Sequence, residues 1–174
     1  KIKIKDCVLN IFLNKKILIY GLGISGLYSY KFLKNKNDIF LYDDNKLKIK
    51  TLGTKENLIS YKEIIKTKFD QIIISPGIDI DKSQLSKFLK KNYNKFFSDL
   101  DVSYSFYKSD FITITGTNGK STTCQLMYEV LSSQKFDTKL VGNIGNPVLS
   151  VKNVKKKTVF VIEASSYQLE YSRI

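Results

Sequence analysis

Residues 112–122 read ITITGTNGKST, and this segment joins an apolar, β-branched run to a loop that holds two glycines, a lysine and paired hydroxyls. Apolar side chains then recur at positions 124, 127, 128 and 131, which is the spacing of one face of a helix. We therefore predict a strand, a phosphate-binding loop and a helix in succession. The strict P-loop pattern is not met, because Ile114 stands where its first glycine is expected. An ordinary tight turn is the alternative.

Each residue type in this loop suits a nucleoside triphosphate and a magnesium ion. Glycine lets the backbone approach a phosphate closely, and the helix N-terminus offers N–H groups and a positive dipole end. Lys120 can reach the outer phosphates, and a hydroxyl of Ser121 or Thr122 can ligate Mg²⁺. The predicted ATP-binding residues are Gly116, Thr117, Asn118, Gly119, Lys120, Ser121 and Thr122.

Composition narrows the classes of function. The chain has 174 residues, a formal net charge of +13 and no histidine. Histidine-based acid–base catalysis and histidine metal ligands are therefore excluded within these residues. The lysines are dispersed along the whole chain, which is typical of a solvated surface rather than of a nucleic-acid-binding site.

The sequence also bears on the compartment. No apolar run approaches the ~20 residues of a membrane span, and no secretory signal is visible. Cys7 and Cys124 have no metal-binding or redox spacing, which suits a reducing cytoplasm. We expect a cytoplasmic monomer without nucleic-acid or membrane partners.

Short apolar runs alternate with helical patterns along the chain. Runs that are apolar throughout are typical of parallel sheets with helices on both faces, so the fold class is predicted to be α/β. We expect a Rossmann-like domain at residues 1–108 and the first part of a P-loop ATPase domain at residues 109–174. The predicted strands are 16–20, 39–42, 71–74, 111–114, 138–141 and 159–162, and the predicted helices lie around 25–34, 62–67, 82–92 and 120–133.

The first half carries a glycine motif of its own. Residues 21–26 read GLGISG after the first strand, which matches the G-x-G-x-x-G pattern of nucleotide-binding turns. Asp43 ends the next strand, near the position at which a ribose-binding acid is expected, and Gly77 follows the third strand at the same sheet edge. The motif predicts bound nucleotide phosphates without identifying the nucleotide. A glycine-rich turn needed only for close packing is the alternative.

Two more segments follow strands in the second half. Residues 142–147 read GNIGNP, which indicates either a turn or a loop that approaches a ligand. Glu163 ends the last strand, where a Mg²⁺ ligand of a phosphate-loop protein is needed. A surface acid that caps the following helix is the alternative for Glu163.

Taken in order, GLGISG, SPGI, GTNGKST, GNIG and EASSYQLE resemble the Mur ligases of peptidoglycan synthesis. The resemblance runs over roughly residues 16–172, and GLGISG, SPGI and SSYQLE narrow it to the member that adds D-glutamate. It implies that the first domain binds the UDP end of the substrate rather than NAD. The residues it implies for the UDP-substrate are Gly23, Ser25, Gly26, Asp43, Gly77, Asn143, Ser165 and Gln168.

The resemblance also implies a reaction. ATP phosphorylates the carboxylate of UDP-N-acetylmuramoyl-L-alanine, and the amine of D-glutamate attacks the acyl phosphate to form an amide. Lys120 and Glu163 would be the catalytic residues, and Ser121 and Glu163 would share a Mg²⁺. Asp43 is followed by Asp44 and Asn45, where many members of the family place a small and then a basic residue.

Because Ile174 falls within the expected ATPase domain, we expect the amino-terminal part of such a ligase, without its C-terminal domain and inactive alone. One alternative is a sibling Mur ligase that adds a different amino acid. Another is a non-catalytic module that binds NAD or another nucleotide. A basic nucleic-acid-binding protein with a phosphate loop is a third.

Overall fold

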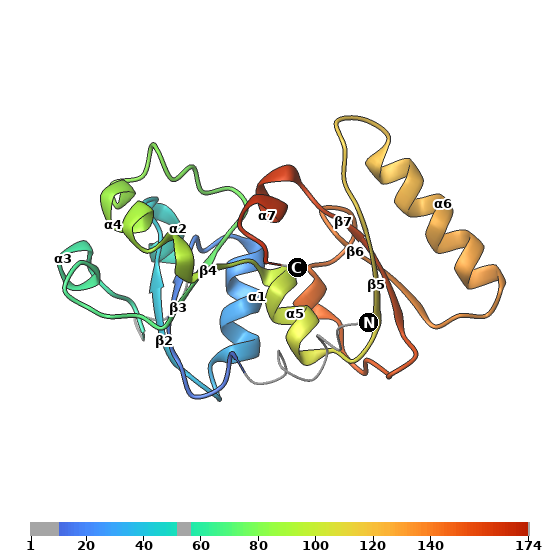
Figure 1. The fold of residues 1–174 in the computed structure, drawn as a ribbon, viewed down its shortest axis with the longest axis horizontal. Coiled ribbons are helices and arrows are strands. Elements are labelled where there is room, and N and C mark those ends of the chain that lie inside the picture. The colour runs from blue at the N-terminus through green and yellow to red at the C-terminus, as the bar shows by residue number, and fades with distance from the viewer. Residues whose placement is uncertain (1–10, 52–56, 174) are drawn as a thin grey trace.

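The computed structural model describes residues 11–51 and 57–173, and it contains two parallel sheets with helices packed between and around them (Figure 1). The predicted α/β fold with parallel sheets is confirmed. The strands are β1 (Lys16–Tyr20), β2 (Asp38–Tyr42), β3 (Gln71–Ile74), β4 (Phe96–Phe97), β5 (Asp110–Ile114), β6 (Thr138–Gly142) and β7 (Val159–Glu163). The α-helices are α1 (Ile24–Leu33), α2 (Lys46–Thr51), α3 (Tyr61–Ile64), α4 (Ser86–Lys91), α5 (Asp99–Phe106), α6 (Lys120–Ser133) and α7 (Ser166–Glu170).

The first sheet has the strand order β2-β1-β3-β4, with every pair parallel. β1 lies between two neighbours and is covered on both faces, which is why its sequence is apolar without alternation. Tyr20 pairs with Tyr42 on one side and with Ile74 on the other. The carboxyl ends of β1, β2 and β3 therefore lie side by side.

The second sheet has the order β5-β7-β6 and is also parallel. All five residues of the central strand β7 are buried, whereas β5 at the edge is half exposed. Glu163 pairs with Ile114 on one side and with Gly142 on the other. This register brings the loops that follow all three strands to one edge of the sheet.

The predicted helices differ in how well they match the structure. The phosphate-loop helix α6 has the predicted bounds, and α1 differs by one residue at each end. α4 is shorter than predicted, because residues 82–85 form a turn before it. The sequence patterns did not predict α2, β4, α5 or α7.

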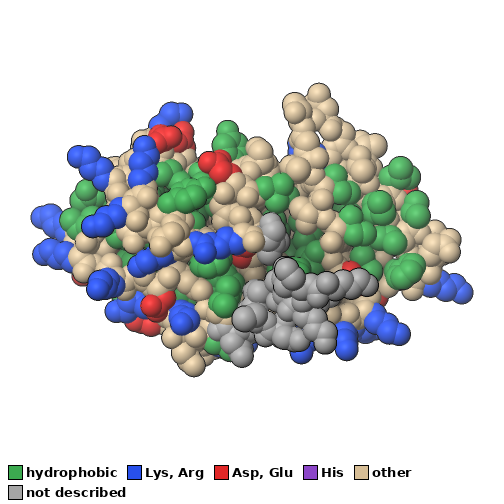
Figure 2. Space-filling model, in the orientation of Figure 1, with side chains coloured by type: hydrophobic (Ala, Val, Ile, Leu, Met, Phe, Trp, Pro, Cys, Tyr) green, Lys and Arg blue, Asp and Glu red, His purple; other side chains and the backbone are tan. Residues whose placement is uncertain are grey.

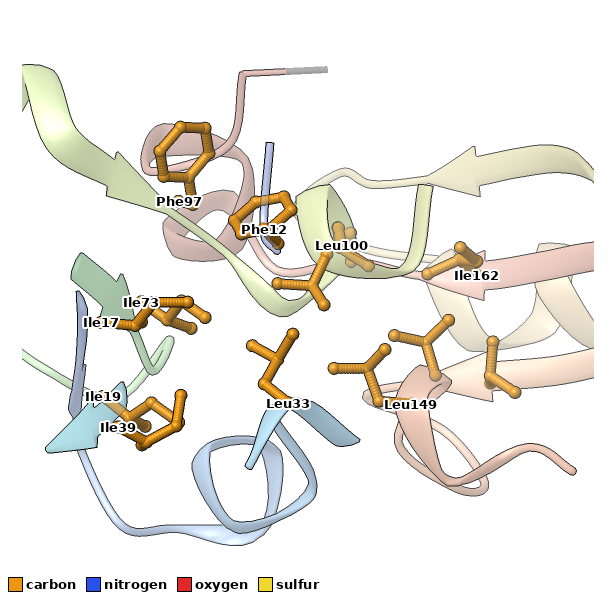
Figure 3. Packing of buried hydrophobic residues seen from close by; sticks show 14 of the residues in the cluster. Phe12, Ile17, Ile19, Leu33, Ile39, Ile73, Phe97, Leu100, Leu149 and Ile162 are labelled. Atoms are coloured by element: carbon orange, nitrogen blue, oxygen red, sulfur yellow. The ribbon is translucent and has the colours of Figure 1, made fainter. Parts of the chain in front are cut away.

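One apolar core joins the two sheets. Leu33 of α1, Leu100 of α5, Leu149 of the 3₁₀ helix Val148–Ser150, and Ile162 of β7 belong to a single buried cluster (Figure 3). Phe12 also lies in it and packs edge-on against Phe97, with ring centroids 5.0 Å apart. The sheets therefore share hydrophobic contacts, and the division into domains at residue 108 stays a prediction.

Of the two cysteines, Cys124 lies among the described residues. Cys124 is a free, buried thiol on α6. Its burial raises the pKa of the thiol, and the negative charge of nearby Glu163 raises it further. Cys7 lies outside the described residues. Among the helices that the structure describes, none has the length and apolar character to cross a bilayer.

Candidate functional site

The loop between β5 and α6, residues 115–119, was predicted to bind phosphate and is termed the phosphate loop below. Gly116 and Gly119 have φ angles of 149° and 76°, in a region that other residues rarely adopt. Gly119 forms the N-cap of α6 without any side-chain cap, so the first N–H groups of that helix have no side-chain acceptor at the cap. They face the loop and can bind an anion.

Lys120 begins α6 and folds back over the phosphate loop. Its ammonium Nζ donates to the Gly116 carbonyl at 2.7 Å and to the Thr117 carbonyl at 3.3 Å. These contacts are solvent-exposed, so a phosphate group that enters the loop can replace the two carbonyls as acceptor. The Lys120 ammonium is thus held over the phosphate loop.

The side chains of Ser121, at the start of α6, and Glu163, at the end of β7, meet at one edge of the second sheet. The Ser121 hydroxyl donates to Glu163 Oε2 at 2.8 Å, although the two residues are 42 positions apart. Glu163 is buried at the end of β7, where the register of both neighbouring strands fixes it. A hydroxyl and a carboxylate are the hard oxygen ligands that Mg²⁺ prefers, with its remaining positions taken by water and phosphate.

The GNIG segment, residues 142–145, approaches the backbone of Glu163. A side chain at Gly142 would place its Cβ 2.2 Å from the Glu163 carbonyl oxygen, so only glycine fits there. The Asn143 N–H donates to that carbonyl at 2.9 Å. The backbone of Asn143 therefore lies beside Glu163 at one edge of the second sheet.

The segment of residues 21–26, termed the glycine-rich turn below, is closely packed. A Cβ at Gly26 would lie 1.9 Å from the Gly21 carbonyl oxygen, and one at Gly21 would lie 2.6 Å from Ser75 Cβ. The Ser75 hydroxyl donates to the Gly21 carbonyl at 2.7 Å. Gly23 differs, because no atom lies within 4 Å of its hypothetical Cβ. A ligand can therefore approach the backbone at Gly23.

Asp43 supports the glycine-rich turn from the end of β2. Its Oδ2 accepts from the Leu22 N–H at 2.7 Å, and its Oδ1 accepts from the Asn45 N–H at 2.8 Å. The Lys48 ammonium lies 3.6 Å from the same carboxylate. Asp43 is only 4% exposed, so little of its surface is open to a ribose or a uracil. Its predicted contact with a nucleotide stays a prediction.

Two buried tyrosines, Tyr20 and Tyr42, end β1 and β2, and their ring centroids lie 5.5 Å apart. Burial raises the pKa of Tyr42 to about 12, with Asp44 acting in the same direction. Burial and a hydrogen bond to Asp44 raise the pKa of Tyr20 further. Both phenols therefore resist ionisation in the folded protein.

Gly77 lies in the segment after β3, which forms one wall of a cavity of about 560 Å³. Helix α7, which follows β7 of the second sheet, also lines the cavity, with Tyr167 among its lining residues. The cavity thus lies between the segment after β3 and helix α7. Gly77 is exposed and lines it with backbone atoms alone. The sequence predicted that Gly77 contacts a ligand but did not predict α7 opposite it.

Ser165 and Gln168 cap helix α7. The Ser165 hydroxyl accepts from the Gln168 N–H at 3.1 Å, and the Gln168 amide oxygen accepts from the Ser165 N–H at 3.3 Å. Gln168 is buried, and its Nε2 donates to Asp99 at 3.0 Å. Its side chain is thus engaged within the protein. The contacts of both residues with a substrate stay predictions.

The lysines do not gather into one patch on the face shown in Figure 2, where they are spread along the first sheet and the lower rim. Apolar side chains are more prominent over α6, where Leu126 and Val130 are exposed. The described residues include no group of three or more His, Cys, Asp or Glu side chains that could hold a metal ion. Ser121 and Glu163 would therefore need phosphate or water to complete an ion's coordination.

Comparison with known proteins gives a consistent result. Residues 114–174 match the Mur ligase middle domain. The chain is 35% identical over 167 residues to the UDP-N-acetylmuramoylalanine–D-glutamate ligase of Rickettsia felis, an alignment that covers 93% of this chain and 36% of the relative. It is 36% identical over 167 residues to the ligase of the same name from Caldicellulosiruptor bescii, with 90% of this chain and 36% of the relative covered. The chain thus spans about a third of the length of the curated relatives that it matches.

Proposed function

We propose that this chain is the amino-terminal part of an ATP-dependent ligase that joins D-glutamate to UDP-N-acetylmuramoyl-L-alanine. The observation that carries this proposal is the Ser121–Glu163 contact beside a phosphate loop, in residues that match the Mur ligase middle domain. A simple dinucleotide-binding module needs neither that contact nor the loop. The similarity to D-glutamate ligases over nine-tenths of the chain favours this member of the family.

In this proposal the glycine-rich turn and the phosphate loop bind different substrates. The glycine-rich turn binds the diphosphate of the UDP-substrate, because the Gly23 backbone is open and α1 begins directly after it. Ser25, Gly26, Asp43 and Gly77 lie around the same sheet edge. The muramoyl-alanine end extends toward Asn143 and Ser165 at the second sheet. The phosphate loop binds ATP with residues 116–122.

The chain's own groups account for phosphoryl transfer by positioning and charge. Lys120 leaves the Gly116 and Thr117 carbonyls and donates to the transferred phosphoryl group, where negative charge increases in the transition state. Mg²⁺, held by Ser121 and Glu163, supplies further charge neutralisation when bound. No protein nucleophile is required, because the substrate carboxylate accepts the phosphoryl group and the amine of D-glutamate then displaces phosphate.

The deciding experiment measures phosphate release from ATP by the complete protein that contains this chain. UDP-N-acetylmuramoyl-L-alanine is present throughout, and D-glutamate is added or omitted. Release of phosphate in stoichiometric amounts with amide product, dependent on both substrates, is the expected result. The 174-residue chain alone should bind UDP-substrate without turnover.

Other outcomes would favour the alternatives. Release that requires an amino acid other than D-glutamate would retain the family and change the member. Tight NAD binding without phosphate release would favour the dinucleotide-binding module. We further propose that the protein acts as a cytoplasmic monomer on small molecules, without nucleic-acid or membrane partners, which sedimentation and cell fractionation can test.

A further inference from the structure

The segment that follows α7, residues 171–173, packs against the first sheet and is termed the α7 tail below. Tyr171 is 6% exposed and packs edge-on against Phe96 of β4, with ring centroids 6.0 Å apart. It belongs to a second buried apolar cluster, whose other members come from residues 18–96. A side chain that follows the last strand of the second sheet is thus part of the core of the first.

Arg173 contacts the same strand on its other face. Its guanidinium carbon lies 4.5 Å from the centroid of the Phe97 ring, and its Nε donates to the Phe96 carbonyl at 3.0 Å. Successive side chains of a strand point to opposite faces, and Phe96 and Phe97 accordingly belong to different apolar clusters. Because β4 ends the strand order of the first sheet, the α7 tail contacts an edge strand on both faces.

The backbone around the α7 tail is bound as well. The Asp101 carboxylate of α5 accepts from the Ser172 hydroxyl at 3.1 Å and from the Arg173 N–H at 2.7 Å. At the end of α7, the Tyr93 hydroxyl donates to the Glu170 carbonyl at 3.3 Å. Each residue from the end of α7 onward in the tail thus contacts a group that precedes the phosphate loop.

This attachment bears on how the two sheets are held relative to each other. Helix α7 begins three residues after Glu163, the proposed ion ligand, and lines the same cavity as Gly77. The apolar core that the sheets share, which includes Leu33 and Ile162, contacts the first sheet on one face. Tyr171 lies in the cluster on the opposite face. A single contact region permits rotation about itself, whereas contacts on both faces of one sheet oppose it.

We propose that Arg173 is a positioning residue for phosphoryl transfer, which fixes the first sheet relative to the second by binding β4 through the α7 tail. The inference rests on the proposed function, because it takes the UDP-substrate to bind at the first sheet and ATP at the second. Reacting atoms must approach to about 3–3.5 Å, and a misplacement of about 1 Å can lower a rate about 10²-fold. The contacts of Arg173 lie at β4 and α5, so it acts on the reaction through the α7 tail.

Lys95, one residue before Phe96, offers a matched control. Its ammonium donates to the Phe69 carbonyl at 2.8 Å, which is the same kind of bond from a cation to a backbone carbonyl. Both of these residues belong to the part of the chain that forms the first sheet. Lys95→Ala therefore removes one positive charge and one such bond, as Arg173→Ala does, but at a contact within the first sheet's part of the chain.

The first test compares Arg173→Ala with Lys95→Ala in the complete protein, at a temperature well below both melting midpoints. We expect Arg173→Ala to lower kcat for phosphate release that depends on D-glutamate by about tenfold or more. The KM for ATP and the affinity for UDP should be unchanged, because each of these ligands binds at one sheet. Lys95→Ala should lose stability and retain kcat.

A second readout measures the relative position of the sheets directly, because a partly unfolded sample would also lose kcat without a change in KM. Spin labels are attached at Lys62→Cys on α3 and Glu129→Cys on α6, with the native cysteines replaced by alanine. We expect a narrow distribution of label distances in the unmodified and Lys95→Ala proteins and a broader one in Arg173→Ala. Destabilisation alone leaves the distances within folded molecules unchanged.

Unchanged kcat in Arg173→Ala, an equal loss in Lys95→Ala, or an unbroadened distance distribution would overturn the inference. If Arg173→Ala fails to fold, Arg173→Met provides the same comparison, because it keeps an unbranched side chain beside Phe97 without a charge or an N–H donor. A lack of phosphate release by the unmodified protein would reject the proposed function, and with it the role in phosphoryl transfer. The distance distributions would then still decide whether Arg173 fixes the two sheets.

Discussion

The two glycine-containing turns follow strands in the same way but are held very differently. The glycine-rich turn is fixed by contacts from outside it, since Ser75 binds the Gly21 carbonyl and Asp43 binds the Leu22 N–H. The phosphate loop is held mainly by its own lysine, which binds the Gly116 and Thr117 carbonyls in solvent. The first is a preformed surface, and the second exchanges internal hydrogen bonds for bonds to its ligand.

This difference indicates where substitutions should affect stability and where they should affect chemistry. A closely packed turn cannot change shape, so its residues contribute to both folding and binding. A loop held by exposed hydrogen bonds contributes little to folding, because such bonds are exchanged with water at a small free-energy difference.

Lys120→Ala should have the largest effect, on activity alone. Removal of a donor to charge that increases in the transition state lowers rates by about 10²–10³-fold. We expect that loss in phosphate release by the complete protein, with an unchanged melting temperature, because the lysine's bonds in the free protein are exposed. Lys152→Ala, which alters an exposed lysine elsewhere on the second half, is the control. A loss below tenfold would reject the assigned role.

Gly26→Ala should have the next largest effect, on stability. Its Cβ would lie 1.9 Å from the Gly21 carbonyl oxygen, and overpacking of this kind costs about 1–3 kcal/mol. We expect a corresponding fall in the free energy of unfolding, measured with urea. Gly23→Ala is the matched control, because open space surrounds that position and its φ of −72° suits alanine.

Gly23→Ala should retain stability and lose affinity for the UDP-substrate, since its methyl group would occupy the space that the ligand needs. If both alanine variants lost the same stability, the glycine-rich turn would not be divided into a packed and an open part. If neither lost affinity, the open backbone at Gly23 would not be a binding surface.

The sequence predicted the second sheet and the phosphate loop better than the helices between the sheets. The loop was predictable because glycines, lysine and hydroxyls are required at fixed places by the chemistry of phosphate. α5 was not, because its sequence DLDVSYSF places buried serines and acids where a helix pattern requires apolar residues. Those polar residues are explained by contacts with distant segments, such as Gln168 and Arg173. A signal existed in the capping box of Ser98 and Asp101.

The site residues show the same division. The Ser121–Glu163 contact could be anticipated, since the loop after β5 and the end of the adjacent parallel strand β7 lie at the same edge of the sheet, and Ser121 is the second residue of the helix that follows this loop. The roles of Asp43 and Gln168 could not be foreseen, because burial depends on which segments pack against them. Their assignment to ligand binding, which for Gln168 came from the family resemblance alone, stays a prediction, and in the structure their polar atoms bind the protein's own groups.

Glu163→Gln should raise the Mg²⁺ concentration needed for half-maximal phosphate release by about tenfold, within the range seen when groups around a metal site are altered. Glutamine still accepts the Ser121 hydroxyl, so the fold should remain intact and the effect should be confined to the ion. Glu129→Gln, which changes an exposed carboxylate on α6, should leave the Mg²⁺ dependence unchanged. An unaltered Mg²⁺ dependence in Glu163→Gln would place the ion elsewhere.

The smallest expected effect is on the free energy of unfolding at alkaline pH. Burial raises the pKa of Tyr42 to about 12, against roughly 10 in an unfolded chain. The native state therefore favours the neutral phenol, and its stabilising contribution is complete below pH 10 and is lost as the pH rises toward about 12. Tyr42→Phe cannot ionise at this position, so the unfolding free energy should fall less steeply over that window. Tyr20 and Tyr171, whose pKa values are also raised, should retain part of the pH dependence of the unfolding free energy.

Urea unfolding from pH 8 to 11.5 measures the slopes, with Tyr167→Phe as a control at a residue that is 60% exposed. Equal slopes for Tyr42→Phe and the unmodified protein would mean that Tyr42 does not contribute to the alkaline pH dependence of stability.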